Sequence, residues 1–266
     1  MPTKHNPYTY IHNDIKKMEF FWDQFKIPGS VTPPLDKWKN NIPFFEQISS
    51  HNSVLILIWD ASHNRILFAV DKKKVVGHDM SLYMAENGIF FSMSNIHPDY
   101  LAAGLMMQQT AFKYILETNE AEQGNVIVNF DGLYKKNNGE YFHFLQQIVA
   151  LDADINHPPT IFLSYIQDIS YYKKEKTANM VITRSGEAAL WNFNFDRQIL
   201  EPIQSTSSQE KKVLAFLGRG KQSKEIASQL GISSHTVDTH RRNLLKKTNC
   251  VDTTGLITYA KLVGLL

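Results

Sequence analysis

The sequence that decides the fold is Ser223–His240, which reads SKEIASQLGISSHTVDTH. Its apolar residues recur at helical spacing up to Leu230 and predict a short helix, with Ser223 as its N-cap. Gly231 suits the left-handed backbone that ends such a helix, and a serine follows it where the next helix can begin. A short helix, a glycine turn and a second helix form a helix-turn-helix, a motif that places its second helix in the major groove of DNA.

The flanking sequence extends this motif into a small helical domain. Residues 208–217 predict a preceding helix, with Ser207 or Ser208 as N-cap and Glu210 in its first turn, where a carboxylate suits the helix dipole. Cys250, which follows the second helix of the motif, is expected to be a small core residue. The residues that would form the core of this domain are Val213, Leu214, Leu217, Ile226, Ala227, Leu230, Val237, Leu244 and Leu245.

Charge is divided unevenly along the chain. The 266 residues include 28 Lys and Arg and 26 Asp and Glu, for a net charge of +2. Residues 205–266 hold ten of the basic and four of the acidic residues, so this tail carries +6 and the rest of the chain −4. A basic tail behind an acidic body predicts two units with different partners, the tail binding a polyanion.

The outer face of the second helix carries residue types that read DNA. Short hydroxyl side chains lie near its N-terminus and long donors further along, with Asp238 as the one acid among them. This order suits a helix that enters the major groove by its N-terminus, whereas a merely solvated basic helix would interleave more acids. We therefore expect a DNA interface formed by Ser223, Lys224, Ser234, His235, Thr236, Asp238, Thr239, Arg242, Asn243, Lys246 and Lys247.

These same residues resemble a known family. Residues 206–266 are similar to the LuxR-type (NarL/FixJ-type) helix-turn-helix of bacterial transcription regulators. The family pattern T-x-R-E-x-E-V-L, G-x-S-N-K-E-I-A and I-S-x-x-T-V-K-x-H is met by residues 207–214, 220–227 and 232–240. The resemblance implies a fourth helix at about 254–263, which in this family often serves dimerisation.

The chain departs from the family pattern at three positions. Gln209 stands where the family usually has Arg and Lys212 where it usually has Glu, so an ion pair common in the family is not expected here. Asp238 replaces a usual Lys, and a carboxylate there would repel phosphate but could accept a hydrogen bond from cytosine N4. We hypothesise that Asp238, Thr239 and Arg242 read bases. The residues expected mainly to position the DNA backbone are Thr236, Asn243, Lys246 and Lys247.

The N-terminal body has the element order of an α+β domain. Strand patterns at 53–59 and 65–70 flank a hairpin turn, a helix is expected at 98–117, and three further strands are expected at 126–134, 140–151 and 160–169. This order, together with IHPDYLAAGLMMQQ (96–109) and the closing strands within 132–170, resembles the PAS fold. The resemblance implies a sensory or dimerising module in which one face of the sheet can hold a ligand.

We therefore predict an α+β fold class: a PAS-like antiparallel sheet with flanking helices, followed by an all-α four-helix LuxR-type helix-turn-helix domain. The predicted parts are an N-terminal extension (1–50) with a docking helix at Met18–Phe25, the PAS-like domain (51–195), a linker (196–206) and the DNA-binding domain (207–266). Within this division, residues 179–203 are expected to form an extra hairpin, a coupling segment or a dimer contact.

Several function classes are excluded. The longest apolar run, Val54–Trp59, is strand-sized, whereas a membrane helix needs about 20 residues, and the N-terminus lacks a signal-peptide pattern. We expect a soluble, cytoplasmic protein. The histidines and acids of the body show no nucleophile–base spacing, so we expect no enzyme, no catalytic residue and no metal site. No cofactor is predicted: the body lacks the cysteine of flavin photosensors, and His97 is expected to cap a helix or to be a core residue rather than to bind haem.

The combined interpretation is a sequence-specific DNA-binding transcription regulator controlled by its PAS-like domain. Its expected partners are double-stranded DNA, a second copy of the chain as a homodimer, and an unidentified small-molecule effector or protein partner, with no membrane. The alternative is a regulator whose N-terminal domain only dimerises or docks proteins and binds no small molecule. A closed, apolar pocket on the PAS-like sheet would favour the first interpretation, and a filled core the second.

Overall fold

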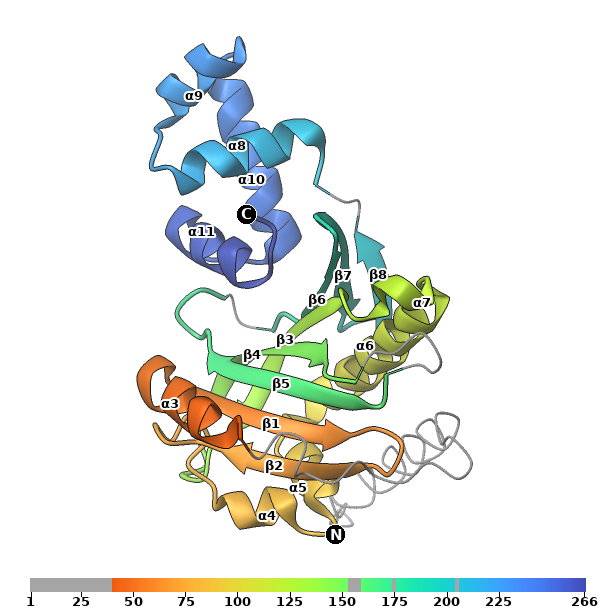
Figure 1. Cartoon of the computed structure of the whole chain (residues 1–266). Helices are drawn as coiled ribbons and strands as arrows, with labels where there is room; N and C mark the ends of the chain where they lie inside the picture. Colours follow the sequence, from red (N-terminus) through yellow and green to blue (C-terminus); the bar gives the residue numbers. More distant parts are fainter. Residues whose placement is uncertain (1–39, 153–158, 174–175, 204–205) are drawn as a thin grey trace, which may run out of the picture.

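The computed structural model describes residues 40–152, 159–173, 176–203 and 206–266. The predicted docking helix at Met18–Phe25 lies outside these residues. The described chain forms an α+β body beneath a helical C-terminal domain, as the sequence predicted (Figure 1). No helix in these ranges is long and apolar enough to span a bilayer.

One antiparallel sheet forms the centre of the body. Its order is β2-β1-β5-β4-β3-β6-β7-β8, and the first five strands are those predicted for the PAS-like domain. The strands are β1 (Val54–Asp60), β2 (Arg65–Val70), β3 (Ile127–Lys135), β4 (Tyr141–Ala150), β5 (Ile161–Asp168), β6 (Asn179–Arg184), β7 (Glu187–Asn194) and β8 (Ile199–Ile203).

The last three strands revise the predicted boundary between the domains. Within residues 179–203, β6 and β7 form an antiparallel hairpin, as expected, and β6 also pairs with the free edge of β3, so the hairpin continues the sheet. β8 then pairs with β7 inside the segment expected to be a linker (196–206), so the sheet extends to Ile203. The pairing satisfies the backbone groups of a segment that would otherwise need solvent.

Helices cover the inner face of the sheet. They are α4 (Met80–Met84), α5 (Gly88–Ser94), α6 (Pro98–Glu117) and α7 (Glu120–Gln123). The long helix α6 has the predicted bounds, and His97 caps it as expected by accepting the backbone N–H of Asp99 at Nδ1, 3.2 Å away. The main core lies between these helices and the inward side chains of the sheet.

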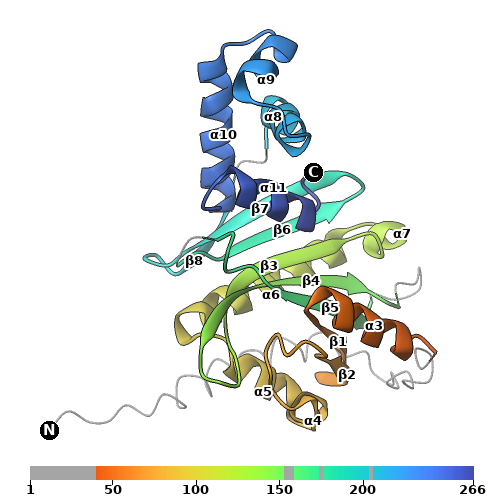
Figure 2. The same ribbon diagram turned by 90° about the vertical axis from the view of Figure 1, so that its left-hand side faces the viewer.

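Two separate units cover the opposite, outer face. Helix α3 (Ile42–Asn52), which lies largely in the predicted N-terminal extension, packs through Phe45 on the outward side chains of β1 and β2. The C-terminal domain packs on the part of this face formed by β4, β6 and β7, as the two views show (Figures 1 and 2). The sheet therefore has the main core on one side, and α3 and the helical domain on the other.

The C-terminal domain has the predicted four helices. They are α8 (Ser208–Gly218), α9 (Ser223–Leu230), α10 (Ser234–Thr248) and α11 (Thr253–Leu262). Ser207 and Glu210 form a reciprocal capping box at the start of α8. Gly231 ends α9 in the left-handed region at φ +66°, and Ser233 caps α10 through the backbone N–H of Thr236.

One predicted cap is wrong. The N-cap of α9 is Gln222, whose backbone N–H donates to Glu225 Oε2 at 2.8 Å, and Ser223 is the first residue inside the helix. The hydroxyl of Ser223 bonds Asp238 of α10 instead. The competing partner lies 15 residues away in the sequence, so local capping rules could not identify it.

Candidate nucleic-acid interface and ligand pocket

Helix α10 separates its buried and exposed residues at the helical period. Val237, Leu244 and Thr248 are buried and hold the helix against the rest of the chain. Successive residues are rotated by 100°, so His235, Thr239, Arg242 and Lys246 lie on the opposite, outer face. Figure 2 shows that the first turn of α10 is the end farthest from the sheet. This arrangement leaves the predicted reading end of α10 accessible.

Three outer-face residues are connected along the helix. Arg242 donates from Nη2 to Thr239 Oγ1 at 3.1 Å, and Thr239 donates to the carbonyl of His235 at 3.0 Å. Arg242 also donates from Nε to the carbonyl of Asp238 at 3.4 Å, so the guanidinium lies along the helix surface. Two of the three residues predicted to read bases, Thr239 and Arg242, are thus brought together.

Asp238, the third of these, lies on the flank of α10 that faces α9. Its Oδ1 accepts the hydroxyl of Ser223 at 2.8 Å and lies 3.2 Å from Nη2 of Arg241. The carboxylate therefore ties the start of α9 to α10 and is partly neutralised by arginine. This position explains how the helix tolerates an acid beside a surface of basic residues.

Lys247 lies on the other flank, toward α8. Its Nζ is 2.7 Å from Glu210 Oε2, and the two side chains are only 16% and 4% exposed. Although burial opposes ionisation of Glu210, the bonds from Lys247 and Ser207 hold its pKa below the usual value. The ammonium of Lys247 thus points into the domain and away from the outer face.

The remaining predicted residues lie at the helix starts or along α10. Lys224, Ser234 and His235 are exposed, and Thr236 is half-buried beside the cap residue Ser233. Two others, Asn243 and Lys246, are exposed and line a cleft of about 530 Å³ between α10 and strands β7 and β8. The predicted set thus divides into an outer group and three residues, Ser223, Asp238 and Lys247, whose side chains bond between helices of the domain.

Helix α11 packs on the sheet. Its apolar residues Leu256, Tyr259, Ala260 and Val263 are buried together with Leu145, Val181 and Leu190 of the body. The backbone continues this contact, because Val251 donates its N–H to the carbonyl of Tyr172 at 3.0 Å. In this chain the fourth helix, which the family resemblance associates with dimerisation, is covered by the chain's own sheet.

A buried polar cluster lies at the centre of this contact. Lys173 Nζ is 2.8 Å from Asp131 Oδ2, and neither side chain is exposed. The carboxylate also accepts the Tyr259 hydroxyl at 3.0 Å, His143 Nε2 at 3.1 Å and the Asn179 backbone N–H at 3.1 Å. Burial opposes its ionisation, but the charge of Lys173 and the bond from His143 hold the pKa of Asp131 below its usual value.

Lys173 also bonds the C-terminal domain directly. Its Nζ donates to the carbonyl of Thr248 at 2.6 Å and lies 3.8 Å from the ring centroid of Tyr259. Sequence reasoning missed this cluster. The one signal was Asp131 itself, an acid within the strand-like run IVNFDGLYK, and such a residue indicates a buried partner without identifying it.

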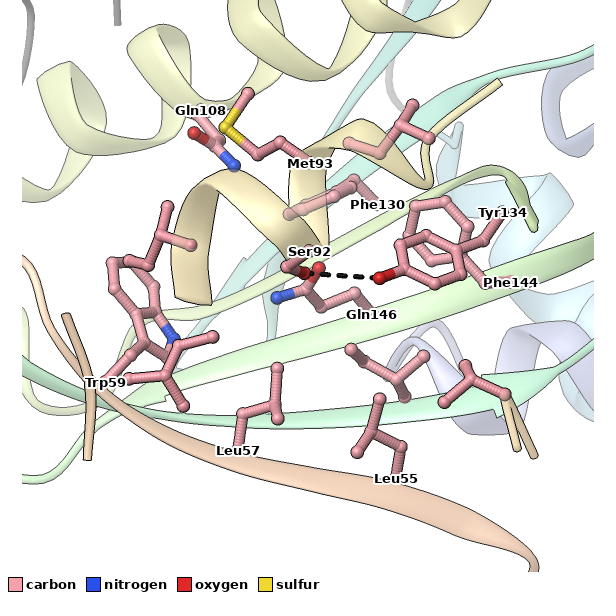
Figure 3. Close-up of a pocket in the computed structure, with 15 residues that line it drawn as sticks. Leu55, Leu57, Trp59, Ser92, Met93, Gln108, Phe130, Tyr134, Phe144 and Gln146 are labelled. Carbon is pink, nitrogen blue, oxygen red and sulfur yellow. Dashed lines mark hydrogen bonds between the residues drawn. The ribbon is translucent and has the colours of Figure 1, made fainter. Parts of the chain in front are cut away.

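A cavity of about 70 Å³ lies on the inner face, between the sheet and helices α5 and α6 (Figure 3). Its wall is mostly apolar, with a few polar groups among the aliphatic and aromatic side chains. The lining residues are Leu55, Leu57, Trp59, Ile66, Val76, Ile89, Ser92, Met93, Ile96, Gln108, Phe130, Tyr134, Phe144, Gln146 and Ile166. No residue of this wall was predicted from the sequence as a ligand contact.

Two polar positions in the wall have distinct roles. Tyr134 bonds Tyr83 (2.9 Å between hydroxyl oxygens) and Ser92 (3.4 Å), and burial raises the pKa of Tyr134 to about 12, so its hydroxyl stays neutral. Gln108 is different, because its Oε1 is buried without a hydrogen-bond partner among the described residues. An unsatisfied amide oxygen in a cavity wall is a position where a ligand donor would be stabilised.

Comparisons with known proteins identify the C-terminal domain. The profile of the family described as "Bacterial regulatory proteins, luxR family" (GerE) matches residues 204–260. The chain is 36% identical over 86 residues to the regulatory protein SdiA of Escherichia coli K12, and 41% identical over 70 residues to the transcriptional regulatory protein MctR of Rhizobium johnstonii. These stretches cover 32% and 25% of this chain, and only 35% and 33% of the two relatives.

Solved structures give a weaker likeness over more of the chain. The Vibrio cholerae VqmA dimer aligns over 85% of this chain and 88% of its own, with 18% identity and a TM-score of 0.30. The phage VqmA–DPO complex aligns over 86% and 89%, with 16% identity and a TM-score of 0.32. Values this low say nothing about what the present chain binds.

The residues matched by the family profile coincide with the helical C-terminal domain of the structure. The matched segment begins just after the last strand of the sheet and contains α8, α9 and α10 and most of α11. Both matched relatives are named as regulatory proteins. Residues 204–260 of this chain are therefore similar to the luxR family of bacterial regulatory proteins.

Proposed function

We propose that the chain is a sequence-specific DNA-binding transcription regulator that acts as a homodimer in the cytoplasm. The observation that carries this proposal is the outer face of α10, where His235, Thr239, Arg242 and Lys246 are accessible and the one nearby acid, Asp238, is bonded to Ser223 and Arg241. Two copies would place two such helices about one DNA turn apart, at roughly 34 Å.

The geometry suggests a division of roles within the predicted DNA-binding residues. In this proposal Thr239 and Arg242, with His235, contact base edges, and Lys224, Asn243 and Lys246 contact the DNA backbone. Ser234 and Thr236 lie in the first turn of α10, where their hydroxyls can donate to phosphate. Ser223, Asp238 and Lys247 would support this surface by fixing α9 and α8 against α10.

The test is binding of the full chain to DNA selected from a randomised library. Arg242→Ala is expected to weaken binding to the selected site about ten- to a hundredfold, with relaxed preference at one base position. Lys261→Ala is the matched control, because it also removes one exposed positive charge but lies on α11, near the sheet. Equal losses in the two variants, or no enrichment of any sequence, would contradict the proposal.

We further propose that the inner cavity binds a compact, mainly apolar small molecule. The mostly apolar wall and the unsatisfied Oε1 of Gln108 support a ligand with one hydrogen-bond donor directed at that oxygen. The competing interpretation, a body that only dimerises, would leave this interior filled by side chains. The cavity is the specific observation that favours a ligand.

Native mass spectrometry of the full chain purified from its own cells tests this second proposal. A bound compound is expected, and Leu57→Phe should eliminate it because this side chain projects into the cavity (Figure 3). Leu67→Phe is the matched control, since Leu67 packs on the α3 side of the sheet. A protein that is compound-free in all three forms favours the dimerisation-only interpretation.

A further inference from the structure

We propose that Asp131, Lys173 and Tyr259 form a latch that holds the DNA-binding domain on the sheet, and that the cavity acts on DNA binding through this latch. The inference rests on the proposed function, because it presupposes DNA contact by α10. It adds a structural connection between the inner cavity and the DNA-reading end of α10. Three features of the structure support it.

The first feature is the position of the latch residues on different parts of the chain. Asp131 is on β3, Lys173 follows β5, and Tyr259 is on α11. The carboxylate of Asp131 accepts the phenol of Tyr259 and pairs with the ammonium of Lys173. Because all three side chains are buried, these contacts form only when the helical domain sits in this one orientation.

The second feature is the attachment of the recognition helix itself. Lys173 donates to the carbonyl of Thr248, in the last turn of α10, and the side-chain Nδ2 of Asn179 donates to the carbonyl of Lys247 at 3.3 Å. Helix α10 is continuous from this turn to its first turn, which carries the DNA-reading end. A change at the latch therefore changes the direction of the DNA-reading end of α10.

The third feature is that the latch and the cavity share two strands. Phe130 and Gln146 are cross-strand partners on β3 and β4, and both line the cavity. The adjacent pair in the same register is Asp131 and Leu145, and both contact the helical domain. Successive side chains of a strand point to opposite faces, so the cavity wall and the latch are neighbouring residues of the same backbone.

Hydrogen exchange of the full chain tests the latch without any DNA or ligand. Tyr259→Phe and Asp131→Asn are expected to speed amide exchange in α11 at least tenfold while leaving α9 unchanged. The matched control is Asp60→Asn, because Asp60 is equally buried and bonds His63, but lies at the hairpin turn between β1 and β2. Exchange in α11 that is equal in Asp131→Asn and Asp60→Asn would overturn the latch. If Asp131→Asn does not fold, unchanged α11 exchange in Tyr259→Phe overturns it.

A double-mutant cycle on DNA affinity tests the route from the cavity. Gln146→Leu changes the cavity wall on β4 and is expected to shift the Kd for the selected DNA severalfold in the wild-type background. In the Tyr259→Phe background, Gln146→Leu should change the logarithm of Kd by less than half as much as it does in the wild-type background. Leu67→Ala is the control, because Leu67 lies outside the cavity wall. It should change the Kd by the same factor in the wild-type and Tyr259→Phe backgrounds.

The outcomes separate the two proposals. If Gln146→Leu has no effect, or the same effect in both backgrounds, the cavity does not act through the latch. If the wild-type chain selects no DNA sequence, the proposed function fails, and hydrogen exchange still decides whether the latch exists.

Discussion

The two faces of strands β3 and β4 differ in chemistry although they share one backbone. The inner face presents Phe130, Tyr134 and Phe144 to helices and a cavity, whereas the outer face presents Asn129, Asp131 and His143 toward the C-terminal domain. Apolar contacts are non-directional and can adapt around a small empty volume. Buried polar groups must meet their partners at hydrogen-bond geometry. The inner face of the sheet is thus suited to bind a small molecule in its cavity. The outer face is suited to hold the C-terminal domain in one orientation.

The largest effect that would sharpen this contrast is expected from Lys173→Met. It leaves the carboxylate of Asp131 buried without its positive partner, which typically costs about 3–5 kcal/mol of the free energy of unfolding. Urea denaturation of the full chain measures it. Adding Asp131→Asn should recover most of the loss, because no uncompensated charge then remains. A double variant no more stable than Lys173→Met alone would show that packing, and not charge, fixes the outer face.

A smaller effect is expected from acid, since protonated Asp131 keeps its shape and its ability to hydrogen bond. The pKa of Asp131 is lower in the folded chain than its unfolded value of about 4, so the folded state binds the proton more weakly. The stability from this group is therefore fully present above about pH 4 and is lost as the pH falls through the lowered value. The urea midpoints of wild type and Asp131→Asn should converge over that acidic range. A constant difference down to the lowest pH would contradict the pKa shift.

The smallest effects on the free energy of unfolding are expected from removing one tyrosine hydroxyl on each face of the sheet. Tyr259→Phe removes a bond to a charged carboxylate and should cost about 1.5–3 kcal/mol of unfolding free energy. Tyr83→Phe removes the neutral bond to Tyr134 near the cavity and should cost about 0.5–1.5 kcal/mol. Chemical denaturation of the two variants side by side measures both. A larger loss for Tyr83→Phe would break the contrast between the faces.

Local sequence patterns predicted most of the secondary structure. Helix α6 and strand β2 have their predicted bounds, and Gly231 adopts the left-handed backbone expected of it. Such features depend on residues close in the chain: apolar period, caps and turn glycines. The exceptions have distant partners. Ser223 bonds Asp238 instead of capping α9, and residues 199–203 pair with β7 instead of linking two domains.

The sequence by itself therefore determined the helix-turn-helix and the candidate outer face of α10, because apolar period, caps and the turn glycine depend on residues close together in the chain. Only the tertiary structure decided that Asp238 and Lys247 bond inside their domain, that α11 is covered by the sheet, and that Asp131 meets Lys173 and Tyr259. These contacts join residues up to 128 positions apart, and no local pattern specifies which distant partner satisfies a buried polar group.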